Sequence, residues 1–110
     1  MAAELSVEAL RAEIDQIDEV LVRLLDRRAR CAYAIGREKH AAGRPVYEPA
    51  RETSVLAHVR KVNAALGGPL DDDAIGRLFE RVIDEARRIQ RIEAERAAPP
   101  AAATDVQDPT

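Results

Sequence analysis

The feature of this sequence that most constrains its fold is a row of apolar residues that keeps helical spacing for unusually long. The row starts at Leu10 and continues in steps of four and three residues as far as Ile35. It ends before Gly43 and Pro45, residues of the kind that stop helices. We therefore predict a helix over about residues 7–41. At about 1.5 Å per residue this helix is roughly 50 Å long, which exceeds the diameter of a domain of this size.

The remainder of the chain predicts two shorter helices and a tail. Pro49 suits the first position of a helix, and the Gly-Gly-Pro run that starts at Gly67 closes it. Asp71 is placed as the N-cap of a third helix. From there we predict one domain over residues 1–96 and a disordered tail over residues 97–110, where Ala, Pro and Thr show no apolar periodicity.

Composition favours an all-α fold. Only 3% of the 110 residues are aromatic, so the core must come from Leu, Ile, Val and Ala, which suit packed helices. The formal net charge of −3 disfavours binding to nucleic acid or anionic membranes. Cys31, the single cysteine, falls on the apolar row, where we expect it to be buried, and it cannot form an internal disulfide. With neither a secretory signal nor a membrane-spanning run, we expect a cytoplasmic protein.

The length of the first helix predicts a homodimer. Two shorter helices cannot cover all of its apolar row, and a solitary helix gains most of its stability from packing. A second copy of the chain would bury the remainder, with the first helices at the centre. A plain two-stranded coiled coil is the alternative, but the shorter helices have apolar faces of their own, which favours a compact helical bundle.

Three cations of the first helix are candidates for a shared site. Arg28 occupies a position of the apolar row, and Lys39 points within about 20° of it, roughly 16 Å along the helix. Arg11 lies about 25 Å from Arg28 and points about 100° away, so the two cannot converge within one chain. In a crossed or antiparallel dimer, Arg11 of one chain can approach the other chain's Arg28 and Lys39. Taken singly, each also has a plain interpretation as a surface or register-setting residue.

Polar residues of the other two helices also face inward. Glu48 and Glu52 continue the apolar stripe of the second helix backwards, with Arg51 beside them, and Gln90 extends the inward row of the third helix. A salt-bridged helix start and a polar helix end are the plain interpretations. Together with the cations, however, these residues indicate a polar pocket inside a helical bundle. Cations and an amide suit a small dianion, and carboxylates suit its hydroxyl group.

Several other chemistries have no support in the sequence. No combination of nucleophile and base is apparent, and His40 and His58 are too isolated to indicate a metal site. A glycine-rich phosphate loop is also missing from the sequence. We therefore expect neither a metal nor a cofactor.

The ordered set of these residues resembles the all-helical class of chorismate mutases over about residues 10 to 90. The matching segments are Leu10-Arg11, Ile14-Asp15, Ile17-Asp18, Leu24-Leu25, Arg28, Ile35-Gly36, Lys39, the run from Gly43 to Glu52, Leu78-Phe79, Ile83 and Gln90. The resemblance implies an intertwined homodimer that converts chorismate to prephenate in phenylalanine and tyrosine biosynthesis, without a cofactor. It also implies two equivalent sites, each completed by an arginine from the partner's first helix.

The resemblance also implies a role for each candidate residue. Arg28 and the partner's Arg11 would hold the two carboxylates of chorismate, while Lys39 and Gln90 would donate hydrogen bonds to the ether oxygen. Such a site accelerates a pericyclic reaction by holding the reactive conformer and by stabilising negative charge on that oxygen.

The remaining site positions include two departures from the family pattern. Glu48 and Glu52 would hold the ring hydroxyl region, and Arg51 would support the binding network. Glu48 stands where the family commonly has Asp, and Ala86 stands where it often has a small hydroxyl residue. A substrate contact at Ala86 would therefore have to come from its backbone or a water molecule.

Two other functions stay open at the level of the sequence. One is an isochorismate pyruvate lyase, which uses a similar bundle, although the loop before Arg51 and Glu52 looks more like the mutase. The other is a non-catalytic helical dimer, or a partner-dependent one, that docks on another enzyme of the shikimate pathway.

Overall fold

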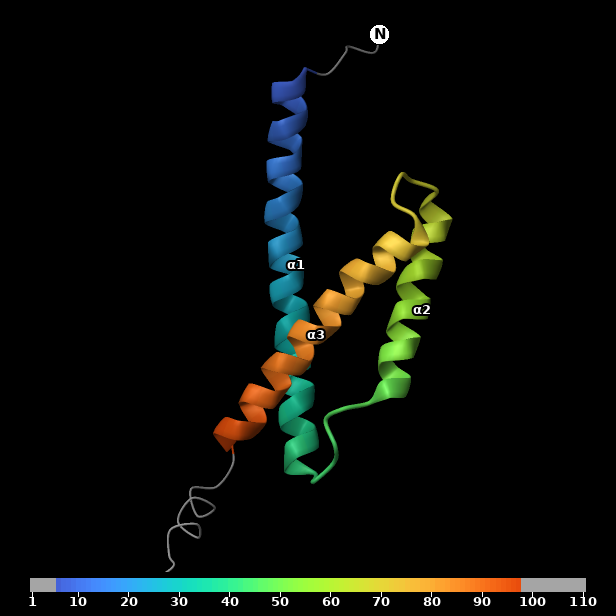
Figure 1. Cartoon of the computed structure of the whole chain (residues 1–110). Helices are drawn as coiled ribbons and strands as arrows, with labels where there is room; N and C mark the ends of the chain where they lie inside the picture. Colours follow the sequence, from blue (N-terminus) through green and yellow to red (C-terminus); the bar gives the residue numbers. More distant parts are fainter. Residues whose placement is uncertain (1–5, 98–110) are drawn as a thin grey trace, which may run out of the picture. The chain divides into compact units, whose positions relative to one another are not determined.

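The computed structural model describes residues 6–97, which form three helices and, within that range, no strand. Helix α1 spans Val7–Ala41, α2 spans Pro49–Leu66 and α3 spans Asp72–Ala97 (Figure 1). The predicted all-α class and the long first helix of 35 residues are therefore confirmed. The tail predicted from Ala97 lies outside the described residues, apart from Ala97 itself, which ends α3.

Local capping rules account for most of the helix ends. The Ser6 hydroxyl accepts a hydrogen bond from the Ala9 amide at 3.0 Å, and the Asp71 carboxylate accepts one from the Ala74 amide at 2.7 Å. Gly67 ends α2 in the left-handed conformation, at φ 62°. Glu48, at the N-cap of α2, makes no capping hydrogen bond with its side chain. Its carboxylate is therefore free for the contact described below.

The chain divides into two compact units, Met1–Cys31 and Ala32–Thr110. In the first unit, the apolar row of α1 is exposed: Leu10 by 42%, Ile14 by 53% and Leu21 by 50%. Cys31 is also exposed in the single chain. Its expected burial depends on a second copy that covers the apolar row, so that expectation stays a prediction.

The second unit contains α2, α3 and the last ten residues of α1, Ala32 to Ala41. Helices α2 and α3 pack against each other as a hairpin (Figure 1). The Asn63 side-chain amide is buried and donates hydrogen bonds to the Leu70 carbonyl at 2.8 Å and to Asp72 at 3.1 Å. Because these groups flank the turn, Asn63 ties the end of α2 to the start of α3. Among the described residues, no helix is both long and apolar enough to span a membrane.

Candidate active site

Lys39 is held at the C-terminal end of α1 by the loop that follows. Its ammonium lies 2.6 Å from the Glu48 carboxylate and donates to the Val46 carbonyl at 3.3 Å. The Arg44 amide donates to the Lys39 carbonyl at 2.8 Å, so the loop turns back over the helix end. Only 11% of the Lys39 side chain is exposed. A lysine that is nearly buried needs such anionic and carbonyl partners to keep its charge.

Glu48 is correspondingly stabilised as a carboxylate. The hydrogen bond from Lys39 and its positive charge lower the pKa of Glu48 below the ordinary glutamate value, and Arg44 contributes more weakly at 3.9 Å. The pair with Lys39 joins the end of α1 to the start of α2.

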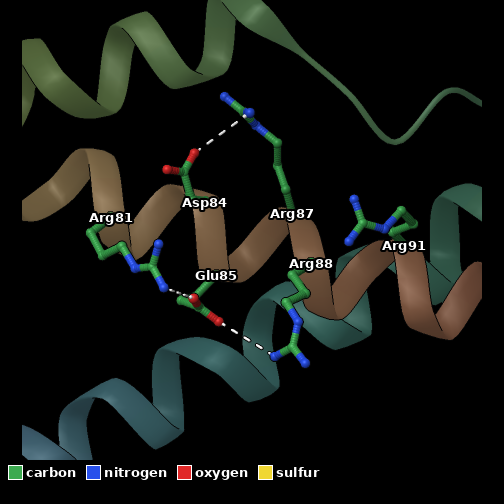
Figure 2. Close-up of a pocket in the computed structure, with 6 residues that line it drawn as sticks. All are labelled: Arg81, Asp84, Glu85, Arg87, Arg88 and Arg91. Atoms are coloured by element: carbon green, nitrogen blue, oxygen red, sulfur yellow. Dashed lines mark ion pairs between the residues drawn. The ribbon is translucent and has the colours of Figure 1, made fainter.

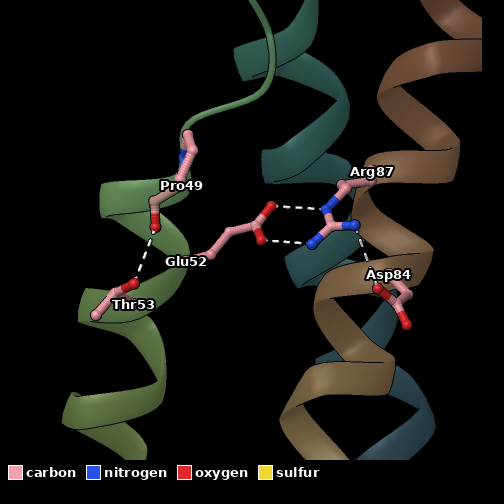
Figure 3. A network of polar contacts seen from close by, with 5 residues as sticks. All are labelled: Pro49, Glu52, Thr53, Asp84 and Arg87. Atoms are coloured by element: carbon pink, nitrogen blue, oxygen red, sulfur yellow. Dashed lines mark hydrogen bonds and ion pairs between the residues drawn. The ribbon is translucent and has the colours of Figure 1, made fainter.

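Glu52 forms a second ion pair, one turn further along α2. Arg87 Nε donates to Glu52 Oε2 at 2.7 Å, and Arg87 Nη2 donates to the other carboxylate oxygen. Figure 3 shows this two-pronged contact between α2 and α3, together with Asp84, whose carboxylate lies 3.6 Å from Arg87 Nη1. The Arg87 guanidinium lies over the Tyr47 ring, and its central carbon is 5.4 Å from the ring centroid. The hydrogen bonds from Arg87 lower the pKa of Glu52.

Gln90 lies where α3 meets the last part of α1. Its side-chain amide donates to the Ala32 carbonyl at 2.9 Å. The close approach depends on Gly36, because a Cβ built at that position would lie only 3.1 Å from Gln90 Cγ. Gly36 is therefore the residue that allows Gln90 to reach the backbone of α1.

One turn beyond Gln90, a buried carboxylate joins the same two helices. Glu93 is only 8% exposed and lies 3.7 Å from Arg37 Nε. A hydrogen bond to Glu93 is the largest cause of a raised pKa for Tyr33. These contacts fasten α3 to the C-terminal part of α1 close to Gln90.

The structure places six of the eight predicted site residues in the second unit: Lys39, Glu48, Arg51, Glu52, Ala86 and Gln90. It pairs Lys39 with Glu48, whereas Glu52 is paired with Arg87, a residue not predicted for the site. Arg51 is exposed and Ala86 is half-buried. Arg11 and Arg28 belong to the first unit, and their meeting with the other residues stays a prediction.

Sequence reasoning did not single out Arg87, and it included Tyr47 only within the run from Gly43 to Glu52. Arg87 lies beside the inward row of α3 rather than on it, and its partner Glu52 is 35 residues away. Only the packing of α2 against α3 reveals the pair. The one signal in the sequence is the position of Arg87 directly after Ala86, the departure from the family pattern.

A hollow of about 450 Å³ lies along α3 and shares Arg87 and Asp84 with the contacts just described. Figure 2 shows the side chains that line it: Arg81, Asp84, Glu85, Arg87, Arg88 and Arg91. Glu85 pairs with Arg81 at 2.8 Å and with Arg88 at 3.7 Å, so much of the charge is neutralised locally. None of the site residues predicted from the sequence lines it. Between residues 6 and 97, no group of three or more potential ligands could hold a metal ion.

The chain is all-α, and cations, carboxylates and an amide lie at the junctions between its helices. These features place it in the class of helical domains with a polar site. The chain belongs to the chorismate mutase type II family, whose model matches residues 10–91. The match confirms the family recognised from the sequence, and it identifies this part of the chain as a chorismate mutase domain.

Individual relatives agree with the family match. The chain is 38% identical over 96 residues to a bifunctional chorismate mutase/prephenate dehydratase of Pseudomonas aeruginosa, covering 83% of this chain and 26% of that protein. It is 42% identical over 86 residues to the T-protein of Enterobacter agglomerans, covering 78% of this chain and 22% of that protein. The chain thus spans about a quarter of the length of these curated relatives.

A solved structure supports the fold. The structure of chorismate mutase (form II) from Thermus thermophilus superposes with a TM-score of 0.73 at 33% sequence identity. The alignment covers 77% of this chain and 93% of that one. The helical architecture is therefore that of a chorismate mutase.

Proposed function

We propose that the chain catalyses the rearrangement of chorismate to prephenate as a homodimer that needs no cofactor. The observation that carries this proposal is the extent of the family match. Residues 10–91 include every residue that the sequence assigns to the site, from Arg11 in the first helix to Gln90 in the third.

The donor groups of the second unit support the chemistry. An ammonium has three N–H donors, and Lys39 uses two of them on Glu48 and Val46. A side-chain amide has two, and Gln90 uses one on Ala32. One donor therefore stays available on each residue for the ether oxygen, where negative charge grows in the transition state. Because both side chains are held in place, little reorganisation would accompany the reaction.

The carboxylates support the binding of a hydroxyl group. A carboxylate offers about four lone-pair sites, and the Arg87 fork occupies two of those on Glu52. The remaining sites can accept a hydrogen bond from the ring hydroxyl. The lowered pKa values of Glu48 and Glu52 favour the ionised form, which is the better acceptor.

The exposed apolar row of the first unit supports the homodimer. Large apolar side chains recur on it from Val7 to Leu25, and exposed contiguous apolar surface marks an interaction site. A second copy covering this row would also bring the partner's Arg11 to a site that includes Arg28. These two arginines would hold the two carboxylates of the substrate.

The test is turnover of chorismate by the purified chain, followed by its absorbance, with the product identified by chromatography. Prephenate is the expected product. Pyruvate released from isochorismate, with no turnover of chorismate, would instead favour the lyase. Inertness towards both would indicate a domain that is active only with a partner enzyme, an arrangement that the bifunctional relatives make reasonable.

A further inference from the structure

We propose that Arg87 is a positioning residue, which holds the Glu52 carboxylate in the orientation that receives the substrate hydroxyl. This inference rests on the proposed mutase function. It deepens that function by adding a residue that neither the family resemblance nor the inward pattern of the helices assigns to the site.

The first step of the argument is the geometry of the pair. Arg87 presents Nε and Nη2 to the two oxygens of Glu52, with Nε at 2.7 Å (Figure 3). Two parallel hydrogen bonds fix the plane of a carboxylate as well as its position, which a single bond does not. The Glu52 side chain is only 21% exposed, so water competes weakly for it.

The second step is that the guanidinium itself is held from three sides. Its central carbon lies over the Tyr47 ring, 5.4 Å from the ring centroid. Asp84 lies 3.6 Å from Nη1, and Glu52 accepts the hydrogen bonds from Nε and Nη2. These partners come from the loop before α2, from α3 and from α2. The position of the Glu52 carboxylate therefore depends, through Arg87, on the position of the loop and of α3.

The third step is the location of the pair within the site. Tyr47 directly precedes Glu48, which binds Lys39, and Arg87 lies one turn before Gln90 on α3. Arg87 thus connects segments that carry three of the predicted site residues. Misplacement of a reacting or binding group by about 1 Å can cost on the order of a hundredfold in rate, so a residue that fixes such segments affects catalysis without touching substrate.

The experiment compares Arg87→Met with a matched control, Arg88→Met. Both positions are exposed arginines on the same helix, but the one ion pair of Arg88 among the described residues is with Glu85, at 3.7 Å and on the same helix. Thermal unfolding and circular dichroism verify the fold, and kcat/KM for chorismate is measured across pH. We expect Arg87→Met to lower kcat/KM roughly ten- to a hundredfold and to move its acidic limb to higher pH. Arg88→Met should stay within about twofold of the wild type.

A double-mutant cycle separates positioning from a general structural role. In the Glu52→Gln background, Arg87→Met should change kcat/KM by less than about twofold, because its target is already lost. An equal loss in both backgrounds would overturn the inference. If Arg87→Met does not fold, Arg87→Lys takes its place. Lysine keeps the positive charge but cannot form the two parallel hydrogen bonds, so we expect a partial loss of kcat/KM.

A measurement that does not depend on activity completes the test. Titration of the Glu52 carboxyl carbon by NMR should give a lowered pKa in the wild type and an ordinary one in Arg87→Met. Identical titrations in a folded variant would overturn the inference even if the wild type converts chorismate normally. Failure of the wild type to convert chorismate would overturn the proposed function, and with it this role of Arg87, while the titration would still report whether the pair exists.

Discussion

The substitution Gly36→Ala should separate stability from catalysis. The new Cβ would lie 3.1 Å from Gln90 Cγ and 3.4 Å from Gln90 Cβ. Carbon atoms attract best at about 3.5–4.0 Å, so the Gln90 side chain must retreat by roughly 0.4 Å or more. The same movement weakens the 2.9 Å hydrogen bond to the Ala32 carbonyl, which directs the amide.

The substitution has two opposing effects on the free energy of unfolding. Alanine is favoured over glycine inside a helix by about 0.5–1 kcal/mol, which offsets the strain of moving Gln90. We therefore expect little change in the free energy of unfolding. Because Gln90 is proposed to donate to the ether oxygen, a displacement of this size should lower kcat roughly tenfold.

The assay is chorismate turnover alongside thermal unfolding, with Gly68→Ala as the control. Gly68 has open space around its Cβ position and no positive φ, so this variant should keep wild-type kcat. Full activity in Gly36→Ala would refute the reasoning. An equal drop in kcat caused by Gly36→Ala in a Gln90→Ala background would also refute it, because the Gln90 side-chain atoms beyond Cβ are absent there.

Three further predictions follow from the contacts and the proposed dimer. Lys39→Ala should abolish most activity while the protein stays folded, because the variant removes a proposed donor to the ether oxygen. Measurements of kcat and circular dichroism check this, and a wild-type kcat would contradict it. Mixing Arg11→Ala chains with Arg28→Ala chains should restore part of the activity that each variant lacks, since every dimer with one chain of each variant contains one intact site. No recovery despite subunit exchange, verified by native mass spectrometry, would contradict the shared site. The lowered pKa of Glu48 stabilises the folded state above the ordinary glutamate pKa, and this contribution is lost as pH falls through the depressed value. The free energy of unfolding should therefore depend less on acidic pH in Glu48→Gln than in the wild type. An unchanged dependence would argue against the pair with Lys39.

Local sequence rules predicted the secondary structure well. Helix α1 ends where Gly43 and Pro45 follow it, and Asp71 caps α3, because both signals act within a few residues of the backbone they affect. The family was also accessible from the sequence, since the ordered polar and apolar positions extend across all three helices. Helical periodicity likewise placed Lys39 and Gln90 on inward faces, and both are at least half-buried.

Periodicity could not identify the partner of each polar group. Glu52 meets Arg87 across 35 residues, and Gln90 meets the Ala32 carbonyl across 58. Both contacts depend on how far each helix is rotated and shifted against its neighbour, and helical spacing within one segment contains no information on either. The exposure of Cys31 has a related cause, because an apolar position on a helix is buried only if another surface covers it. The sequence by itself determined three helices, their ends and the family, whereas the tertiary structure decided which charges pair and which glycine lets Gln90 approach α1, because those depend on the packing of helices distant in sequence.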